Sequence, residues 1–212
     1  MKDIKWEEIK EAEKAGEEIG LELYDILEEA SIYGRELDNV IEKNIEEVLK
    51  REKLLPRNYS VVIPMGALRW TCEDDTCYYT ADFEVFDETG NRVVATGTAT
   101  GTMIPIDKDK MEVIDMRVWL PPENAKKLKV EKLKDLYCTE TGRGTRGSIF
   151  VCDTPEGDII FKVKKIDAYK YSVLSEHPLG KYKTLFYASN RGELKRKLEE
   201  WLKHLLKEMY EE

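Results

Sequence analysis

Residues 77–103 read CYYTADFEVFDETGNRVVATGTATGTM, and this stretch gives the clearest structural signal in the chain. Apolar and polar side chains alternate over 77–86 and again over 92–103, which is the pattern of strands with one buried face. The residues between them, 87–91, have turn chemistry, and Gly90 suits the left-handed position of a tight turn. The sequence therefore predicts a β-hairpin.

The register of this hairpin follows from a three-residue loop at 88–90, with Asp82 facing Thr96 on the solvent side. A one-residue slip would mix the two faces, so we expect a well-specified register. On the buried side, large side chains then face small ones in the pairs Val85–Val93, Phe83–Ala95, Ala81–Gly97 and Tyr79–Ala99.

The region before the hairpin has a helical pattern. Apolar or small residues recur every three or four positions from Ile9 to Tyr33, and a second, offset stripe runs from Leu37 to Leu49. Gly34 stands between the stripes as a helix end. We therefore expect helix over 3–54, folded as an acidic helical hairpin. It would pack on the rest of the chain, and the alternative is a homodimer through these N-terminal helices.

The remainder of the chain reads as strands and two helices. A Lys-rich segment to Leu136 has a weak helical pattern, and residues 190–210 form a strongly amphipathic helix with a capping motif. The fold class is thus α+β, with an N-terminal helical hairpin, a mainly antiparallel sheet of about eight strands, and a C-terminal helix packed on it. We expect two regions, 1–55 and 56–212, or one continuous domain. Strands are expected near 114–120, 147–152, 158–166, 168–175 and 182–188.

Composition indicates the source and compartment. Charged residues make up 36% of the 212 residues, the excess is mostly Lys and Glu, and Gln is absent. This composition is typical of hyperthermophiles, because ion pairs cost less to desolvate in hot water, and we expect an archaeal source. The first residues are charged, without the apolar core of a secretory signal, and no apolar run reaches membrane-spanning length. We therefore expect a cytoplasmic protein with no membrane partner.

Four cysteines occur in two pairs. A two-residue turn at Asp74-Asp75 would place Cys72 directly across from Cys77, and Cys138 and Cys152 flank a loop in the same manner. Their spacings fit structural zinc poorly. Intracellular disulfides are found in hyperthermophiles, so we predict the disulfides 72–77 and 138–152.

The sequence contains little that resembles known catalytic chemistry. Only two histidines occur, His177 in a turn and His204 among charged helix residues, which argues against histidine-based catalysis. No nucleotide-binding or hydrolase motif is present. Carboxylates such as Asp82 and Glu84 leave a metal-dependent, nuclease-like hydrolase as an alternative. We predict no catalytic residue, no metal site and no cofactor.

The basic C-terminal half contains the functional candidates. Residues 125–212 hold 19 Lys and Arg against 14 Asp and Glu, whereas residues 1–124 hold 15 against 29. In the segment 141–148, TGRGTRGS, glycines would let backbone N–H groups approach a phosphate while arginines bind it. Basic residues interleaved with aromatics on a sheet also suit stacking and phosphate neutralisation. An equally good interpretation has the aromatics in the core and the lysines in water.

We therefore expect a non-enzymatic nucleic-acid-associated protein that binds RNA in preference to DNA. A structural or protein-interaction module using the N-terminal helical stripe is a further alternative. The predicted contacts to nucleic acid are Arg143, Arg146, Lys162, Lys164, Lys170 and Lys183.

Overall fold

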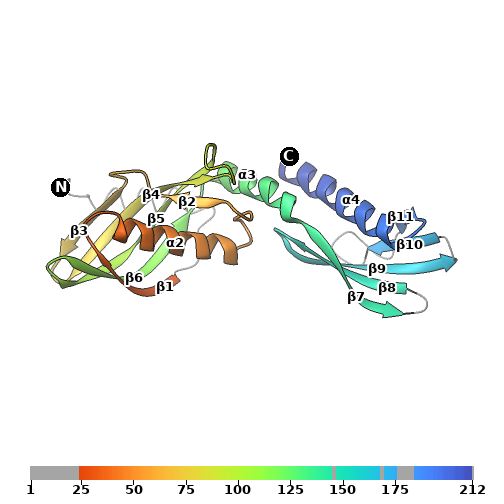
Figure 1. The fold of residues 1–212 in the computed structure, drawn as a ribbon, viewed down its shortest axis with the longest axis horizontal. Helices are drawn as coiled ribbons and strands as arrows, with labels where there is room; N and C mark the ends of the chain where they lie inside the picture. Colours follow the sequence, from red (N-terminus) through yellow and green to blue (C-terminus); the bar gives the residue numbers. More distant parts are fainter. Residues whose placement is uncertain (1–23, 145–146, 168–169, 176–183, 212) are drawn as a thin grey trace. The chain divides into compact units, whose positions relative to one another are not determined.

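The computed structural model describes residues 24–144, 147–167, 170–175 and 184–211. These residues form three α-helices, one short 3-10 helix and eleven strands in two antiparallel sheets (Figure 1). The expected mixture of helices and antiparallel strands is confirmed, but two sheets replace the single sheet that we expected. The chain divides into two compact units that separate between Leu128 and Lys129. The boundary expected at 55/56 therefore falls inside the first unit.

The first unit is built on a curled six-stranded sheet. The strand order is β1-β6-β5-β4-β2, and β3 also pairs with β4. The strands are β1 (Tyr24–Ser31), β2 (Ser60–Val62), β3 (Leu68–Glu73), β4 (Thr76–Phe86), β5 (Val93–Asp107) and β6 (Lys110–Trp119).

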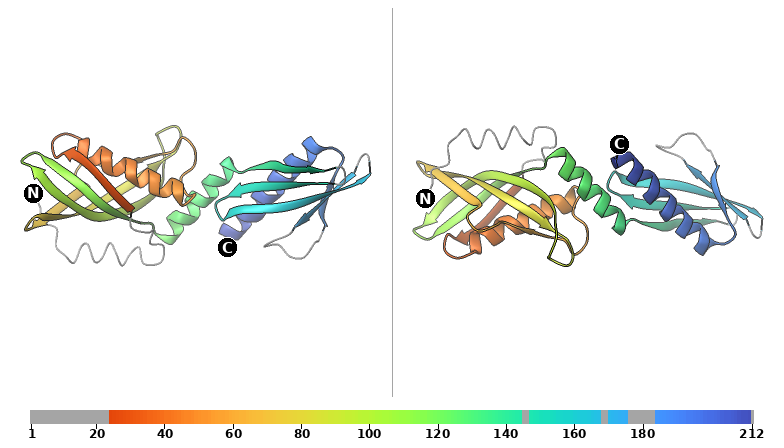
Figure 2. Two further views of the ribbon diagram at one scale, coloured as in Figure 1. Left: turned by 90° about the horizontal axis from the view of Figure 1, so that it is seen from below. Right: turned by 90° about the horizontal axis from the view of Figure 1, so that it is seen from above.

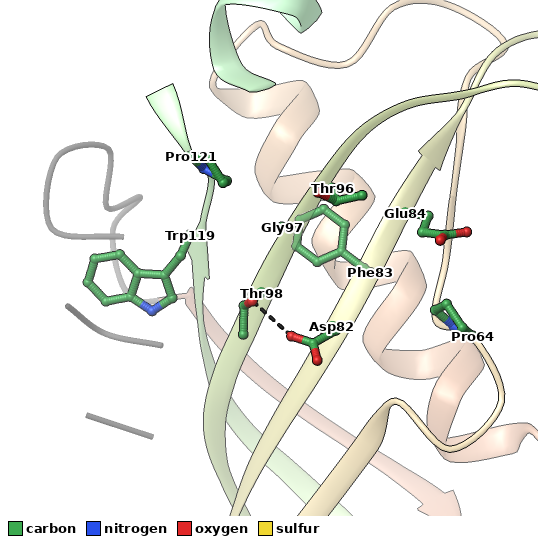
Figure 3. A pocket seen from close by; sticks show the side chains of 9 residues that line it. All are labelled: Pro64, Asp82, Phe83, Glu84, Thr96, Gly97, Thr98, Trp119 and Pro121. Carbon is green, nitrogen blue, oxygen red and sulfur yellow. Dashed lines mark hydrogen bonds between the residues drawn. The ribbon is translucent and has the colours of Figure 1, made fainter. Parts of the chain in front are cut away.

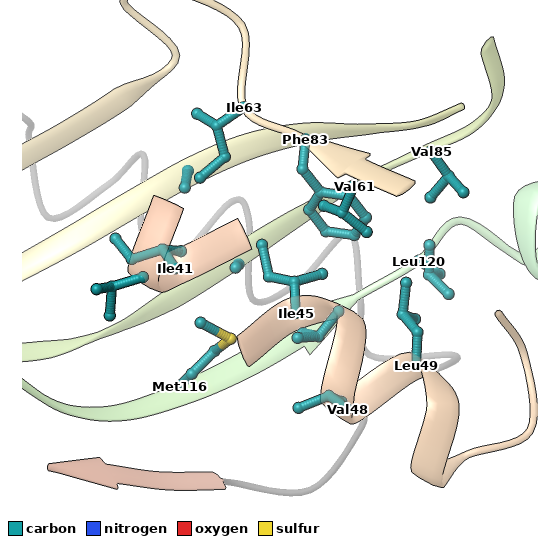
Figure 4. Packing of buried hydrophobic residues seen from close by; sticks show 14 of the residues in the cluster. Ile41, Ile45, Val48, Leu49, Val61, Ile63, Phe83, Val85, Met116 and Leu120 are labelled. Atoms are coloured by element: carbon teal, nitrogen blue, oxygen red, sulfur yellow. The ribbon is translucent and has the colours of Figure 1, made fainter. Parts of the chain in front are cut away.

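Helix α2 (Glu36–Arg51) packs against the concave face of this sheet, as the close view of the core shows (Figure 4). The predicted stripe from Leu37 to Leu49 is the buried side of the helix, and Ile41 and Ile45 are fully buried. Helix and sheet thus form one hydrophobic core, because each supplies one apolar face to the other.

The prediction of helix over 3–54 is wrong for residues 24–31. These residues form β1, which pairs antiparallel with β6 and sets Ala30 beside Met111. A bulge interrupts the pairing between Asp25 and Glu28, where Leu27 has a φ of 53°. The described part of the expected helical hairpin is therefore a strand followed by a helix, and the stripe over 9–23 lies outside the described residues.

The predicted hairpin at 77–103 is confirmed, but its register differs by two residues. Val85 pairs with Ala95 and Phe83 with Gly97, and Asp82 faces Thr98 where Thr96 was expected. The pairing shifts between Val85 and Phe86, which opposes Val93. An even shift keeps Tyr79, Ala81, Phe83 and Val85 on the buried face as expected. The prediction is wrong for Val93, which is 42% exposed, and Thr80 and Thr100 are buried although they belong to the predicted polar face.

The second unit consists of a five-stranded sheet with one helix on one face. Helix α4 (Arg191–Glu211) lies along this face, as the two opposite views in Figure 2 show. Helix α3 (Pro122–Lys132) contains the boundary between the units, and the 3-10 helix η1 (Leu133–Asp135) follows it. The strands, in the order β11-β10-β9-β8-β7, are β7 (Tyr137–Gly144), β8 (Gly147–Thr154), β9 (Gly157–Asp167), β10 (Lys170–Ser175) and β11 (Thr184–Ala188).

Helix α4 matches its predicted position but is rotated relative to the predicted apolar face. Its buried residues follow a spacing of four: Leu194, Leu198, Leu202, Leu206 and Tyr210. The helical pattern of the sequence also predicts Leu205 and Met209 on the apolar face; Leu205 is half-buried, and the prediction is wrong for Met209, which is 54% exposed. The predicted cap is present, since the Asn190 side-chain oxygen accepts a hydrogen bond from the Glu193 N–H at 2.9 Å.

None of the helices in the described ranges is long and apolar enough to cross a membrane.

Candidate nucleic-acid interface

The segment 141–148 is the end of a β-hairpin and not the irregular loop that we expected. Strand β7 continues to Gly144, β8 begins at Gly147, and these two glycines face each other. Residues 145–146 lie outside the described ranges, and Arg146 with them. The glycines therefore belong to paired strands, which gives this segment a defined backbone geometry.

A hollow of about 600 Å³ lies at this end of the sheet. Gly142, Gly144 and Gly147 form part of its lining, and the residues that join them include Arg143, Lys162 and Lys164. Because glycine has no side chain, the three glycines leave space where other residues would fill the surface. The sheet thus brings together three of the six predicted contacts around one concave surface.

The positions of the three cations follow from the strand register. Lys162 pairs with Ile149 and Lys164 with Gly147, whereas Arg143 pairs with Ser148 on the neighbouring strand. Arg143 and Lys164 are exposed, and Lys162 is half-buried. Ser148 and Val163 are buried on the side of the sheet that α4 covers, so strand alternation puts the Arg143 side chain toward that side, and Lys162 and Lys164 are the cations on the opposite face.

The structure does not test the other three predicted contacts at the level of side chains. The backbone of Lys170 pairs with Asp167 in the β9–β10 ladder, and its side chain is outside the described residues. Arg146 and Lys183 lie outside them entirely. These three residues remain predictions from the sequence.

The face of the five-stranded sheet opposite α4, here called the open face, changes in character along its strands. One cross-strand row joins Gly144, Gly147, Lys164, Ser172 and Tyr187. The next rows contain Ile149 beside Lys162, then Val151 beside Ile160, and finally Asp153 beside Asp158. Six residues separate Lys164 from Asp158, or roughly 20 Å along the strand. The acidic end is thus further from the cations than the roughly 8 Å screening length in physiological salt.

Sequence reasoning named Tyr187 among the aromatics interleaved with lysines but missed the exposed isoleucines of the open face. Ile149 is 38% exposed, Ile160 44% and Tyr187 49%, although each lies in a strand. The alternation in β8, GSIFVCDT, contained the signal, because Phe150 and Cys152 face the core and Ile149 must then face outward.

Most described aromatics of this unit point toward α4. Phe161 is fully buried and packs edge-on against Trp201, and Phe186 also contacts Trp201. The interpretation with aromatics in the core is therefore correct for these two rings. Tyr187 differs from them, since it lies on the open face in the same row as Lys164.

Both predicted disulfides are present. Cys72 is bonded to Cys77 across the β3–β4 turn, and Cys138 to Cys152 across β7 and β8. The second bridge is fully buried between the sheet and α4.

Helix α4 also fixes the edge strand β7 that carries Arg143. The Glu199 carboxylate accepts a hydrogen bond from the Cys138 N–H at 2.8 Å, and Arg191 lies 3.1 Å from the Glu140 carboxylate. Arg191 and Glu140 are close enough to form an ion pair, but their atoms are not aligned for a hydrogen bond, so the contact is electrostatic. Occupying an edge N–H in this way limits pairing of β7 with other chains.

Asp82 and Glu84, two of the carboxylates considered for metal chemistry, lie in the first unit beside a cavity of about 280 Å³ (Figure 3). Asp82 accepts a hydrogen bond from the Thr98 hydroxyl at 2.9 Å and forms an ion pair with Arg69 at 3.4 Å. Glu84 also lines the cavity. Throughout the described part of the chain, no three His, Cys, Asp or Glu side chains are grouped so that they could hold a metal ion. Asp82 therefore has structural partners on its own sheet.

Comparison with known proteins identifies no relative. No protein-family model matches the chain, and neither the curated proteins nor the solved structures contain a match. The functional argument therefore rests on the residues of this chain and on the surface that they form.

Proposed function

We propose that the protein is a non-enzymatic nucleic-acid-binding protein that prefers RNA to DNA and contacts phosphates with the cations around the β7–β8 hairpin end. The observation that supports this most is the hollow lined by three glycines and Arg143, where Lys162 and Lys164 lie together on one face of the sheet. Arginine binds phosphate through a planar pair of N–H donors, and lysine neutralises it as a point charge. Arg146, Lys170 and Lys183 complete the proposed set of contacts.

Local charge supports an anionic ligand. The second unit, 129–212, has 17 Lys and Arg against 14 Asp and Glu, whereas 1–128 has 17 against 29. The ionisable residues that line the hollow are Arg143, Lys162 and Lys164. A phosphate entering it meets no carboxylate in that lining, so its attraction is not offset by repulsion.

Fluorescence anisotropy with labelled RNA and DNA oligonucleotides tests this proposal. The variant Lys162→Ala/Lys164→Ala should bind roughly tenfold more weakly at low salt, because two phosphate contacts are lost. Lys195→Ala/Lys203→Ala on α4 is the matched control, since it changes net charge equally and leaves the open face intact. Equal affinity of the two double variants, or no binding by the native protein at low salt, would contradict the proposal.

A further inference from the structure

The open face combines two kinds of side chain that a single-stranded nucleic acid needs and a duplex does not. Ile149, Ile160 and Tyr187 expose apolar surface within strands, and Lys162 and Lys164 stand between them. A duplex hides the flat faces of its bases in the stack, so exposed apolar side chains gain little from it. A single strand can turn its bases onto such a surface while its phosphates meet the lysines.

The strand register places an aromatic ring, a cation and the hollow in sequence along one row of the open face. Tyr187 pairs with Ser172, Ser172 with Lys164, and Lys164 with Gly147, which pairs with Gly144 at the edge of the sheet. This row crosses five strands, or roughly 19 Å at the usual strand spacing. One end of the row has an aromatic ring, the middle has a cation, and the other end is the hollow lined by glycines.

We infer that the open face binds single-stranded RNA, with one base stacked on Tyr187 and the following phosphates led across Lys164 toward the hollow at Gly144. This inference rests on the proposed function, because it names the form of nucleic acid that the same surface selects. Tyr187 is 49% exposed and is separated from Lys164 in the row by the buried Ser172 alone, so we assign its ring and that cation to one RNA strand.

The same face provides its own control. Tyr137 is also a tyrosine on this face, 44% exposed, but it pairs with Asp153 in the acidic row. Asp153 in turn pairs with Asp158, which repels a phosphate backbone. The inference therefore assigns stacking to Tyr187 and none to Tyr137.

Anisotropy with a labelled single-stranded RNA and with the same sequence annealed to its complement tests this inference in the full chain. The native protein should bind the single strand more tightly. Tyr187→Ala should weaken that binding at least about fivefold, because base–aromatic stacking is lost. Tyr187→Phe and Tyr137→Ala should each change it less than twofold. Thermal melting of each variant shows whether the fold is retained.

The possible results distinguish the single-strand inference from the more general proposal of nucleic-acid binding. A duplex bound as tightly as the single strand, or equal losses in Tyr187→Ala and Tyr137→Ala, would overturn the single-strand inference and leave nucleic-acid binding in place. No binding of either RNA form at low salt would overturn both. Rescue by Tyr187→Phe distinguishes stacking from loss of the hydroxyl group, since phenylalanine keeps the ring.

Discussion

A Cβ atom at Gly147 would stand 2.2 Å from the carbonyl oxygen of Val163 on the neighbouring strand. No real side chain tolerates that approach to backbone, so the strands β8 and β9 meet closely here because residue 147 is glycine. Its partner across the hairpin, Gly144, differs, since a Cβ there would only touch the Gly147 carbonyl oxygen at 3.5 Å. Two facing glycines of one hairpin thus have different structural roles.

This difference predicts unequal effects on stability. Gly147→Ala should lower the free energy of unfolding by about 1–3 kcal/mol, because the added methyl forces the strands apart. Gly144→Ala should leave it unchanged or raise it by about 0.4–1 kcal/mol, because alanine restricts the unfolded chain. Urea unfolding of both variants measures this, and equal effects would contradict the assigned contact.

The two disulfides should contribute unequally to stability. The bond between Cys138 and Cys152 closes a loop with a sequence separation of 14, and that between Cys72 and Cys77 one of 5. From loop-closure entropy, the paired Cys→Ala variants should lose about 3 kcal/mol and about 2 kcal/mol, respectively. Denaturant unfolding of the two double variants gives the comparison. A larger loss at 72–77 would show that loop length does not govern the effect.

The carboxylate at the start of α4 should contribute to acid sensitivity. Hydrogen bonds from Lys197 and Ser189 lower the pKa of Glu193 from its ordinary 4.5 to about 2. Because the folded pKa lies below the unfolded one, this group stabilises the fold above about pH 4.5, and that contribution is lost as pH falls toward 2. Glu193→Gln should therefore show a smaller decrease in Tm between pH 5 and 2 than the native protein. Thermal melts across this range check it, and parallel curves for the two proteins would contradict it.

The sequence predicted elements best where one period dominated. Strict alternation over 77–86 gave the hairpin, but the register differs by two because the turn is one residue longer than expected and the bulge between Val85 and Phe86 adds one more. Residues 24–31 satisfy both periods, because Ile26 and Ala30 lie on the helical stripe and also alternate with Tyr24 along a strand. Pairing with β6 resolved that ambiguity in favour of a strand, since tertiary contacts override local propensity.

The candidate site was only partly predictable because it too depends on pairing between distant strands. The cations could be named from the sequence, but their meeting at one hollow depends on the pairing of Lys162 with Ile149 and of Lys164 with Gly147. Which aromatics reach solvent depends on the face that α4 covers, and this separates Phe161 from Tyr187. Long-range pairing of this kind has no signal within a short window of sequence.

The salt dependence of RNA binding tests the central claim most directly, because each neutralised phosphate releases counterions. We expect log affinity for a single-stranded RNA to fall linearly with log salt, by about 0.7 per phosphate contact. In Lys162→Ala/Lys164→Ala, the magnitude of this slope should decrease by about 1.4 relative to the native protein, whereas Lys195→Ala/Lys203→Ala should keep the native slope. An affinity that does not respond to salt, or identical slopes for all three proteins, would contradict binding of phosphates at the hairpin end.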